Sequence, residues 1–345
     1  MLDYRVITQE KLPLFLSALR QSFLLAAPVE EEGEVYFRLL EDPSQVYLGP
    51  RPSRVPPKIF FFPPTEPLLR YRREGEKWEV FSAEQDPRPL ILFGLRPCDL
   101  QSLKALDAVF LASPPDPYYA ARRENTLLLG ISCPEVGPGC FCVTYGYSPT
   151  TSEGADLHFT LLGKFYLVEV LTPRGKKLVQ DYASFFAGET AGALEAKQSK
   201  EASLLAKFVA PPQLTGVKEK LPSLYHDPYW EELAWRCLGC GICTFLCPTC
   251  HCFDIFDRGE EEGERLRCWD TCLFKEFTLH TSGHNPRASL SARLRNRFYH
   301  KLLYHYERYG VEGCVGCGRC VVFCPVNIDI REVMVEVRRR GSSGF

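Results

Sequence analysis

Two cysteine runs in the last third of the chain have the residue type and spacing that hold iron–sulfur clusters. Cys237-x2-Cys240-x2-Cys243-x3-Cys247 is followed by Pro248, and Cys314-x2-Cys317-x2-Cys320-x3-Cys324, of identical spacing, is followed by Pro325. In the bacterial ferredoxin run the first three thiolates bind one cluster and the fourth binds its neighbour. The sequence therefore predicts one [4Fe–4S] cluster on Cys237, Cys240, Cys243 and Cys324, and a second on Cys314, Cys317, Cys320 and Cys247.

Glycines within the runs support this interpretation, since a chain wrapped tightly around a cluster needs positive φ and free backbone N–H groups. They are Gly239, Gly241, Gly316 and Gly318. Zinc is the alternative, because CxxC pairs also build tetrahedral zinc sites. Two zinc ribbons would leave the third cysteine of each run without a role. We keep a zinc-binding structural scaffold as the alternative.

A second group of cysteines lies in the first half of the chain, at Cys98, Cys133, Cys140 and Cys142. They follow expected strands, where a parallel sheet presents its site-bearing loops. Four thiols in such loops can bind a third [4Fe–4S] cluster. The alternative is that they are small buried apolar residues, as free cysteines often are.

Four cysteines remain: Cys250, Cys252, Cys268 and Cys272. Cys268 and Cys272 are four residues apart and would share one face of a helix. Together with Cys250 and Cys252 they could form a further metal site, or they could be packing residues or a redox-active thiol pair.

A basic stretch near the second run contains Arg287, Arg293, Arg295, Arg297 and Lys301. Its simplest interpretation is a solvated helix face, and the next is a docking patch for an acidic partner. It could also offset the negative charge of the clusters.

Composition restricts the class of protein. The net charge of −2 gives no reason to expect nucleic acid as a partner, and no apolar run is long enough to span a membrane. Neither a GxGxxG nor a GxxxxGK[ST] motif is present, so we expect no nucleotide or flavin in this chain. Sixteen cysteines without an export signal at the N-terminus indicate a reducing, cytoplasmic location rather than a disulfide scaffold.

The elements that position these cysteines differ between the two halves. Short aromatic or β-branched runs at 35–37, 58–62, 90–93 and 127–129, with a helix capped by Thr8 over 9–19 and another over 99–110, predict an N-terminal α/β domain over residues 1–209. A Pro- and Lys-containing linker follows at 210–226. Residues 227–340 are predicted to form a mostly α-helical ferredoxin-type dicluster domain. The fold class is therefore α+β and multidomain.

These motifs resemble an iron–sulfur protein family that is shared by cytoplasmic sulfhydrogenases, where it forms the beta subunit, and by anaerobic sulfite reductases. The resemblance runs through Arg96-Pro97-Cys98-Asp99-Leu100, Cys140-Phe141-Cys142, Arg236–Gly241, Cys247–Cys252 and Cys314–Cys320. Residues 282–287 are closer to the sulfhydrogenase-like and heterodisulfide-reductase-associated branch, whereas Cys268 departs from many relatives. The resemblance also favours the third cluster on Cys98, Cys133, Cys140 and Cys142.

The resemblance implies an electron-transfer subunit of a hetero-oligomeric oxidoreductase. It would relay electrons between a flavoprotein subunit linked to NAD(P)H or ferredoxin and a catalytic subunit of the hydrogenase, heterodisulfide reductase or sulfite reductase type, and would carry no catalytic residues of its own. An alternative is that the chain itself reduces sulfur compounds at an exposed thiol or an extra cluster.

Overall fold

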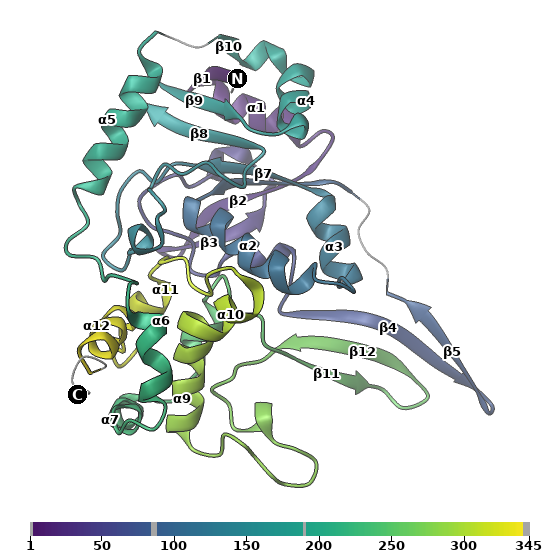
Figure 1. The fold of residues 1–345 in the computed structure, drawn as a ribbon. Coiled ribbons are helices and arrows are strands. Elements are labelled where there is room, and N and C mark those ends of the chain that lie inside the picture. The colour runs from purple at the N-terminus through teal and green to yellow at the C-terminus, as the bar shows by residue number, and fades with distance from the viewer. Residues whose placement is uncertain (1–2, 84–87, 189–190, 341–345) are drawn as a thin grey trace.

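The computed structural model describes residues 3–83, 88–188 and 191–340 (Figure 1). The strands are β1 (Asp3–Thr8), β2 (Leu24–Glu31), β3 (Glu34–Leu39), β4 (Thr65–Glu74), β5 (Lys77–Ser82), β6 (Leu90–Leu95), β7 (Thr126–Ile131), β8 (Leu157–Leu162), β9 (Phe165–Val170), β10 (Ala187–Gly188), β11 (Phe253–Arg258) and β12 (Glu262–Trp269). The α-helices are α1 (Lys11–Leu19), α2 (Pro97–Phe110), α3 (Pro117–Glu124), α4 (Pro173–Asp181), α5 (Ala193–Leu205), α6 (Val217–Lys220), α7 (Tyr229–Arg236), α8 (Ile242–Phe245), α9 (Leu290–Tyr299), α10 (His305–Tyr309), α11 (Arg319–Val322) and α12 (Ile330–Arg340).

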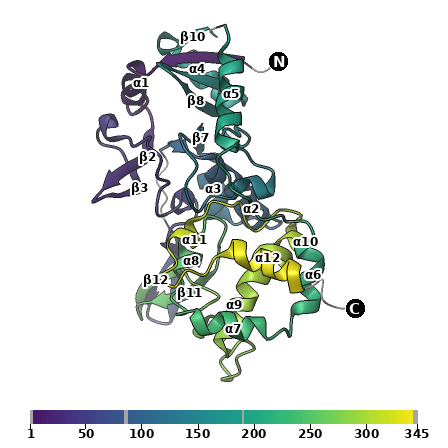
Figure 2. The ribbon, with the colours of Figure 1, turned by 90° about the vertical axis from the view of Figure 1, so that its left-hand side faces the viewer.

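An eight-stranded mixed sheet organises the first half of the chain, in the order β10-β1-β9-β8-β7-β6-β2-β3. The central strands β2, β6, β7 and β8 run parallel. Because side chains alternate across a strand, Ile91 and Phe93 of β6 pack into a core with α1 and α4, while Leu92 packs into a core with α2. Leu95 joins the core of Leu92 because the strand register shifts between Phe93 and Leu95. The sheet is thus buried on both faces, and α2, which follows the carboxyl end of β6, lies next to the helical half of the molecule (Figure 2).

The helical half packs around a separate apolar core. Trp230 of α7 stacks on Phe298 of α9, and Met334 and Val337 of α12 are fully buried beside them. Between α9 and α10 the helix widens into one π-helical turn, His300–Tyr304. Residues 290–309 are thus helical throughout, within the segment 227–340 that the sequence predicts to be mostly α-helical.

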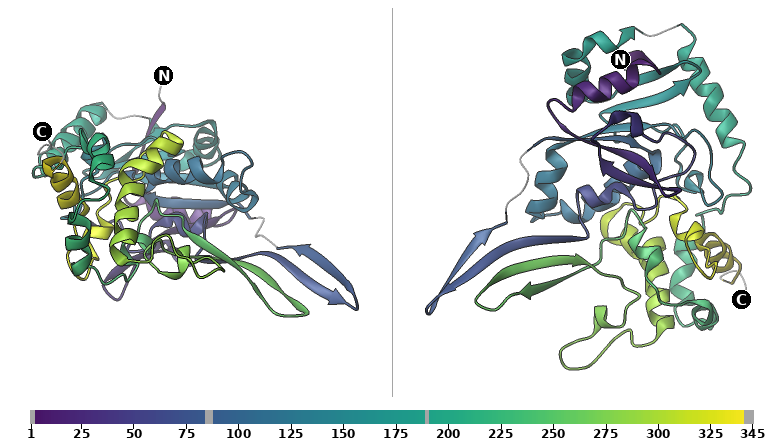
Figure 3. Two further views of the ribbon diagram at one scale, coloured as in Figure 1. Left: turned by 60° about the horizontal axis from the view of Figure 1, so that its bottom comes forward. Right: turned by 180° about the vertical axis from the view of Figure 1, so that it is seen from behind.

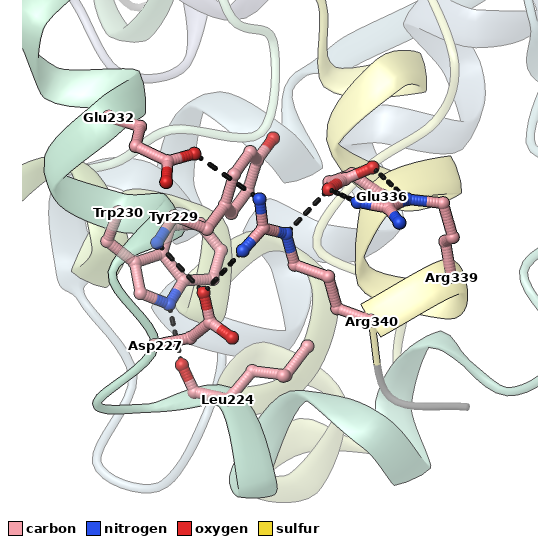
Figure 4. A network of polar contacts seen from close by, with 8 residues as sticks. All are labelled: Leu224, Asp227, Tyr229, Trp230, Glu232, Glu336, Arg339 and Arg340. Carbon is pink, nitrogen blue, oxygen red and sulfur yellow. Dashed lines mark hydrogen bonds and ion pairs between the residues drawn. The ribbon is translucent and has the colours of Figure 1, made fainter. Parts of the chain in front are cut away.

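Arg340, at the end of α12, fixes that helix against α7 (Figure 4). Its guanidinium bonds Asp227 at 3.0 Å, Glu336 at 2.5 Å and Glu232 at 3.3 Å, and it stacks over the ring of Tyr229. The network therefore joins the helix before the first cysteine run to the helix after the second run.

A second sheet projects from the body of the molecule, and no sequence pattern predicts it (Figure 3). Its order is β11-β12-β4-β5, so a hairpin from the helical half pairs with a hairpin from the first half. At its base Arg267 is buried and bonds Glu66 at 2.8 Å and also Asp116. This ion-pair cluster ties the two halves of the chain together.

Two local expectations need correction. Residues 58–62 do not form a strand but a 3₁₀ turn, Pro57–Phe60, because Pro56 and Pro57 precede it and the side chain of Lys58 turns inward to the carbonyl of Cys250. The expected linker contains α6, whose Val217 is buried in the helical core. The α+β multidomain class itself is confirmed.

Candidate iron–sulfur sites

The first site is a small cavity between α7, α8 and α9. Cys237 follows α7, Cys240 lies in the next turn, Cys243 is in α8, and Cys324 comes from the second run. All four line the same cavity, together with Leu273 and Leu294. The structure therefore brings together the crossed set of three plus one thiols that the spacing predicts.

The second site repeats this arrangement next to α11. Cys314, Cys317 and Cys320 line one cavity with Cys247 of the first run, closed by Phe141 and Ile330. The short helices α8 and α11 pack against each other, which places the two cavities side by side. In a pair of zinc ribbons, all the cysteines of one run would line the same site. Here each run instead supplies one thiol to the site of the other run.

Backbone N–H groups point at sulfur in both sites. Gly239 N–H donates to Cys237 Sγ at 3.3 Å, Ile328 N–H to Cys324 Sγ at 3.2 Å, and Gly316 N–H to Cys314 Sγ at 3.5 Å. Hydrogen bonds of this kind stabilise thiolates and raise the reduction potential of a cluster that the sulfurs hold.

The four N-terminal cysteines gather at the carboxyl ends of β6 and β7. Cys98 is in the first turn of α2, Cys133 follows β7, and Cys140 and Cys142 lie in the loop before β8. Burial, together with the charges of neighbouring cysteines in the group, raises the pKa of Cys133 to about 11 and that of Cys142 to about 12. Mutual proximity of buried thiols is what a metal cluster requires, since metal binding supplies the positive charge that deprotonates them.

This loop sits directly on the second cysteine run. Phe141 N–H donates to Gly316 O at 2.9 Å, and a Cβ at Gly318 would lie 2.3 Å from Gly139 O. Gly318 also has φ +76°, so its lack of a side chain serves both the turn and the close approach. The N-terminal thiols are thereby placed next to the second cavity.

Four cationic side chains are buried around these thiols: Lys58, Arg297, Lys301 and Arg319. Arg297 lines both dicluster cavities, and its Nε has no hydrogen-bond partner within the described ranges. Lys301 donates to Thr249 Oγ1 and to Gly313 O, and Arg319 pairs with Asp99. A buried cation without an anion is costly. A [4Fe–4S] cluster with four thiolates carries net negative charge, so such clusters fit these cavities electrostatically.

The pKa values of the two buried lysines reflect a balance between burial and the negative charge of nearby thiols. Burial lowers the pKa of Lys58 to about 8, because the thiols near it compensate only part of the desolvation. For Lys301, burial also disfavours the charged form, but the charges of Cys247, Cys250 and Cys314 outweigh it and raise the pKa. Both lysines therefore depend on negative charge at the thiols to remain protonated at neutral pH.

The solvated-face interpretation is wrong for part of this cationic group. Arg297 and Lys301 are 4% and 3% exposed, so neither lies on a solvated helix face. Sequence reasoning also misses Arg319 and Lys58 as buried cations. For Arg319 the signal lies within the motif, because Gly318-Arg319-Cys320 places an arginine between two predicted ligands.

The remaining cysteines separate into two places. Cys250, Cys252 and Cys272 line a third cavity of about 490 Å³. Cys268 lies on β12, not on a helix shared with Cys272, and its thiol donates to Thr65 Oγ1 at 3.4 Å. The helix expectation is wrong because β12 pairs with β4. In the parts of the chain that the structure describes, no three His, Cys, Asp or Glu side chains converge on a single metal ion.

Comparison with known proteins agrees with this geometry. Residues 236–328 match the 4Fe-4S dicluster domain, which covers both cysteine runs and the insertion between them. The chain is 31% identical to Sulfhydrogenase 2 subunit beta of Pyrococcus furiosus over 338 residues, which is 97% of this chain and 98% of that protein. The chain belongs to the sulfhydrogenase beta-subunit family. It is an iron–sulfur electron-transfer subunit of the kind found in this family.

The sulfhydrogenase relationship extends over both halves of the chain, so the sheet-forming half is part of the family's architecture and not an unrelated addition. The match to the dicluster domain, by contrast, does not cover residues 1–235, which contain the four N-terminal cysteines. Over the described residues, no helix is long and apolar enough to cross a membrane.

Proposed function

We propose that this chain is a relay that carries electrons through three [4Fe–4S] clusters in series. The first would be held by Cys237, Cys240, Cys243 and Cys324, the second by Cys314, Cys317, Cys320 and Cys247, and the third by Cys98, Cys133, Cys140 and Cys142. When bound, the clusters supply one-electron redox chemistry. The chain supplies their positions, their spacing and the charge around them.

The single observation that carries the proposal is that the second thiol group adjoins both the first group and the third. Arg297 lines the cavities of the first and second groups. Arg319 lies beside both Cys317 of the second group and Cys98 of the third. A buried arginine therefore stands at each junction, and each one favours the presence of negative charge on both sides of it.

The two ends of the series differ in exposure. Cys240, in the first group, is the one exposed cysteine within the described parts of the chain, and Trp235 nearby is 89% exposed. The third group lies at the sheet, where Cys98 adjoins Cys317 of the second group. Electrons would thus enter at one end and leave at the other, with the second cluster buried between them.

The partners we propose are a flavoprotein subunit linked to NAD(P)H or ferredoxin and a catalytic redox subunit, within one hetero-oligomer in the cytoplasm. The related Pyrococcus protein is named as the beta subunit of a sulfhydrogenase, which supports membership of a multi-subunit complex. Thiol-rich sites that need reduced cysteines support the reducing compartment.

Metal analysis of anaerobically purified full-length protein tests this proposal. Three clusters require about twelve iron and twelve acid-labile sulfide per chain, and two require about eight. Cys98→Ser is expected to lower the content by about four of each while leaving the other two clusters intact. A zinc scaffold would instead give zinc without labile sulfide, and this outcome would overturn the proposal.

A further inference from the structure

Lys301 is a buried lysine that has no carboxylate partner in the described parts of the chain. It lies in the π-helical turn His300–Tyr304 and is 3% exposed. Its Nζ donates to Thr249 Oγ1 at 2.6 Å and to Gly313 O at 3.0 Å, and both acceptors are neutral. A buried ammonium needs a compensating negative charge nearby. These two hydrogen bonds do not supply one.

The charge of Lys301 faces the cavity of the second cysteine group. Lys301 and Thr249 both line this cavity, together with Cys247, Cys314 and the other two thiols of the group, and no lining residue carries a carboxylate. A [4Fe–4S] cluster held there by four thiolates would be negatively charged. Lys301 is therefore placed to act as its counter-ion.

Thr249 connects Lys301 to one of the cluster ligands. The side chain of Thr249 is completely buried, and its Oγ1 lies 2.7 Å from Gly313 O and 3.2 Å from Cys247 Sγ. A hydroxyl has one proton and cannot donate fully to both. Because Lys301 also donates to Gly313 O, this carbonyl keeps a donor when the hydroxyl turns to Cys247. A thiolate at Cys247 has no proton, so the hydroxyl would be the donor.

Gly313 holds the π-helical turn against the segment that leads into Cys314. A Cβ at Gly313 would lie 2.8 Å from Lys301 O and 2.9 Å from His305 Cβ, so the two backbones pack directly on each other. Single π-helical turns within α-helices are frequent at functional sites. Here the widened turn brings the root of the Lys301 side chain next to the second cysteine run.

The other two cluster sites have less uncompensated positive charge. Arg297 is the only cation that lines the first cavity, and the second cavity shares it. Beside the third group, Arg319 is paired with Asp99. Burial of the second site would by itself lower its reduction potential, because the reduced state is the more negative one. Lys301 and Arg297 oppose this effect, and no carboxylate in the cavity wall cancels them.

We infer that Lys301, positioned by Thr249, raises the reduction potential of the second cluster above those of the other two, so that an electron in the relay rests there. The inference rests on the proposed function for the presence of the three clusters. One electron arrives from the donor subunit and the same electron leaves to the acceptor subunit. Lys301 and Thr249 are neither oxidised nor reduced, and Lys301 keeps its proton throughout.

Redox titration of cluster-loaded, full-length protein, followed anaerobically by electron paramagnetic resonance, tests the inference. Cys317→Ser replaces a ligand of the second cluster alone, and the signal that it alters identifies that cluster. Lys301→Met removes the charge. Thr249→Val removes the hydroxyl and keeps the shape of the side chain, whereas Thr249→Ser keeps the hydroxyl.

Thr126→Val is the matched control for the loss of a buried hydroxyl. Thr126 is 1% exposed, its Oγ1 donates to Arg122 O at 2.7 Å, and it lines neither dicluster cavity. This substitution should leave all three potentials unchanged.

On reduction of the wild type, we expect the signal of the second cluster to appear first. Lys301→Met should lower the potential of this cluster by about 59 mV or more, which is a tenfold change in a one-electron equilibrium. The other two potentials should move much less. Thr249→Val should lower the same potential, and Thr249→Ser should recover most of the loss. If Lys301→Met loads without the second cluster, the two Thr249 variants decide the matter.

A first signal from another cluster would overturn the inference, and so would three equal shifts in Lys301→Met. An unchanged second potential in Thr249→Val would also overturn it. Iron and acid-labile sulfide, measured on the same samples, report on the relay separately. A wild type with about eight iron or fewer contradicts the three-cluster relay itself, whereas full loading with unmoved potentials contradicts only the role of Lys301 and Thr249.

Discussion

Arg319 donates a hydrogen bond to Asp99 at 2.9 Å, and both side chains are almost completely buried. The pair joins α11, inside the second cysteine run, to the first turn of α2, next to Cys98. Arg319 also bonds the carbonyl and hydroxyl oxygens of Ser53. One arginine therefore connects the two halves of the chain at the point where two proposed cluster sites meet.

Replacing that arginine should be costly. Arg319→Gln leaves Asp99 buried without its partner, which typically costs about 3–5 kcal/mol. We expect the midpoint of denaturant unfolding, measured anaerobically, to fall accordingly. Arg265→Gln breaks the exposed pair with Asp257 and should cost only about 0–1 kcal/mol. Equal effects of the two substitutions would contradict the role given to the buried pair.

Arg297 should raise the reduction potentials of the two dicluster sites, because a buried cation stabilises the more negative, reduced state. Removing the charge with Arg297→Gln is expected to lower both potentials, by about 59 mV for a tenfold change in a one-electron equilibrium. Arg297→Lys should restore most of the shift. Redox titration followed by electron paramagnetic resonance measures this, with Arg295→Gln, a surface cation over Tyr225, as the control. Unchanged potentials in the Gln variant would refute the assignment.

Gly318 should tolerate no side chain. In Gly318→Ala the new Cβ meets the Gly139 backbone, which should push the loop 137–142 away from the second run and reduce iron bound at the N-terminal thiols. Gly310→Ala is the matched control, since Gly310 has φ +69° with nothing within 4 Å of the added Cβ. It should cost only the strain of about 1–2 kcal/mol of a left-handed residue. Loss of iron in the control as well would show that backbone strain, not the contact, is responsible.

The cluster of His158 on β8, Glu169 on β9 and Lys197 on α5 should make the stability depend on pH. Burial lowers the pKa of His158, and although burial alone would raise the pKa of Glu169, hydrogen bonds from His158 and Lys197 lower it. Both shifts mean that the unfolded chain binds protons more readily than the native one. Stability should therefore fall as the pH drops below about 6.5, by at most about 1.4 kcal/mol per pH unit for each group.

Thermal unfolding of the protein between pH 7 and pH 5 measures this dependence. His158→Gln removes one of the two groups and should flatten the upper part of the profile. A variant profile identical to that of the wild type would show that other groups cause the loss of stability in acid. Lys177→Gln, at an exposed pair with Asp181, provides a control that should leave the profile unchanged.

The division of the eight C-terminal cysteines between two sites could be predicted from the sequence, because it depends on short-range spacing. Three thiols within seven residues must face one point, and the crossed fourth ligand follows from the repeat, so the grouping around two cavities could be predicted from the runs alone. The N-terminal group could be predicted in outline, since parallel strands end at one edge of a sheet.

The projecting sheet and the buried cations could not be predicted in this way. The pairing of β4 with β12 joins residues nearly two hundred positions apart, and no local pattern announces such a partner. Arg297 and Lys301 lie in a segment as rich in charged residues as a surface helix, and only tertiary contacts with the thiols bury their side chains. The aromatic residues after Lys58 have strand propensity, which favours a strand there, but the prolines before it override that preference.

The projecting sheet also has a consequence for how the protein can be made. In this sheet β12 lies between β11 and β4, which is formed by residues 65–74, so neither half of the chain can form the whole sheet alone. If residues 227–340 were expressed as a separate piece, the edge of β12 that normally pairs with β4 would be exposed and prone to aggregation. During synthesis, β4 cannot pair with β12 until about residue 269 has left the ribosome. The second sheet can therefore form only when both halves of the chain are present. The chain is expected to complete its folding as one unit, although it contains two separate apolar cores.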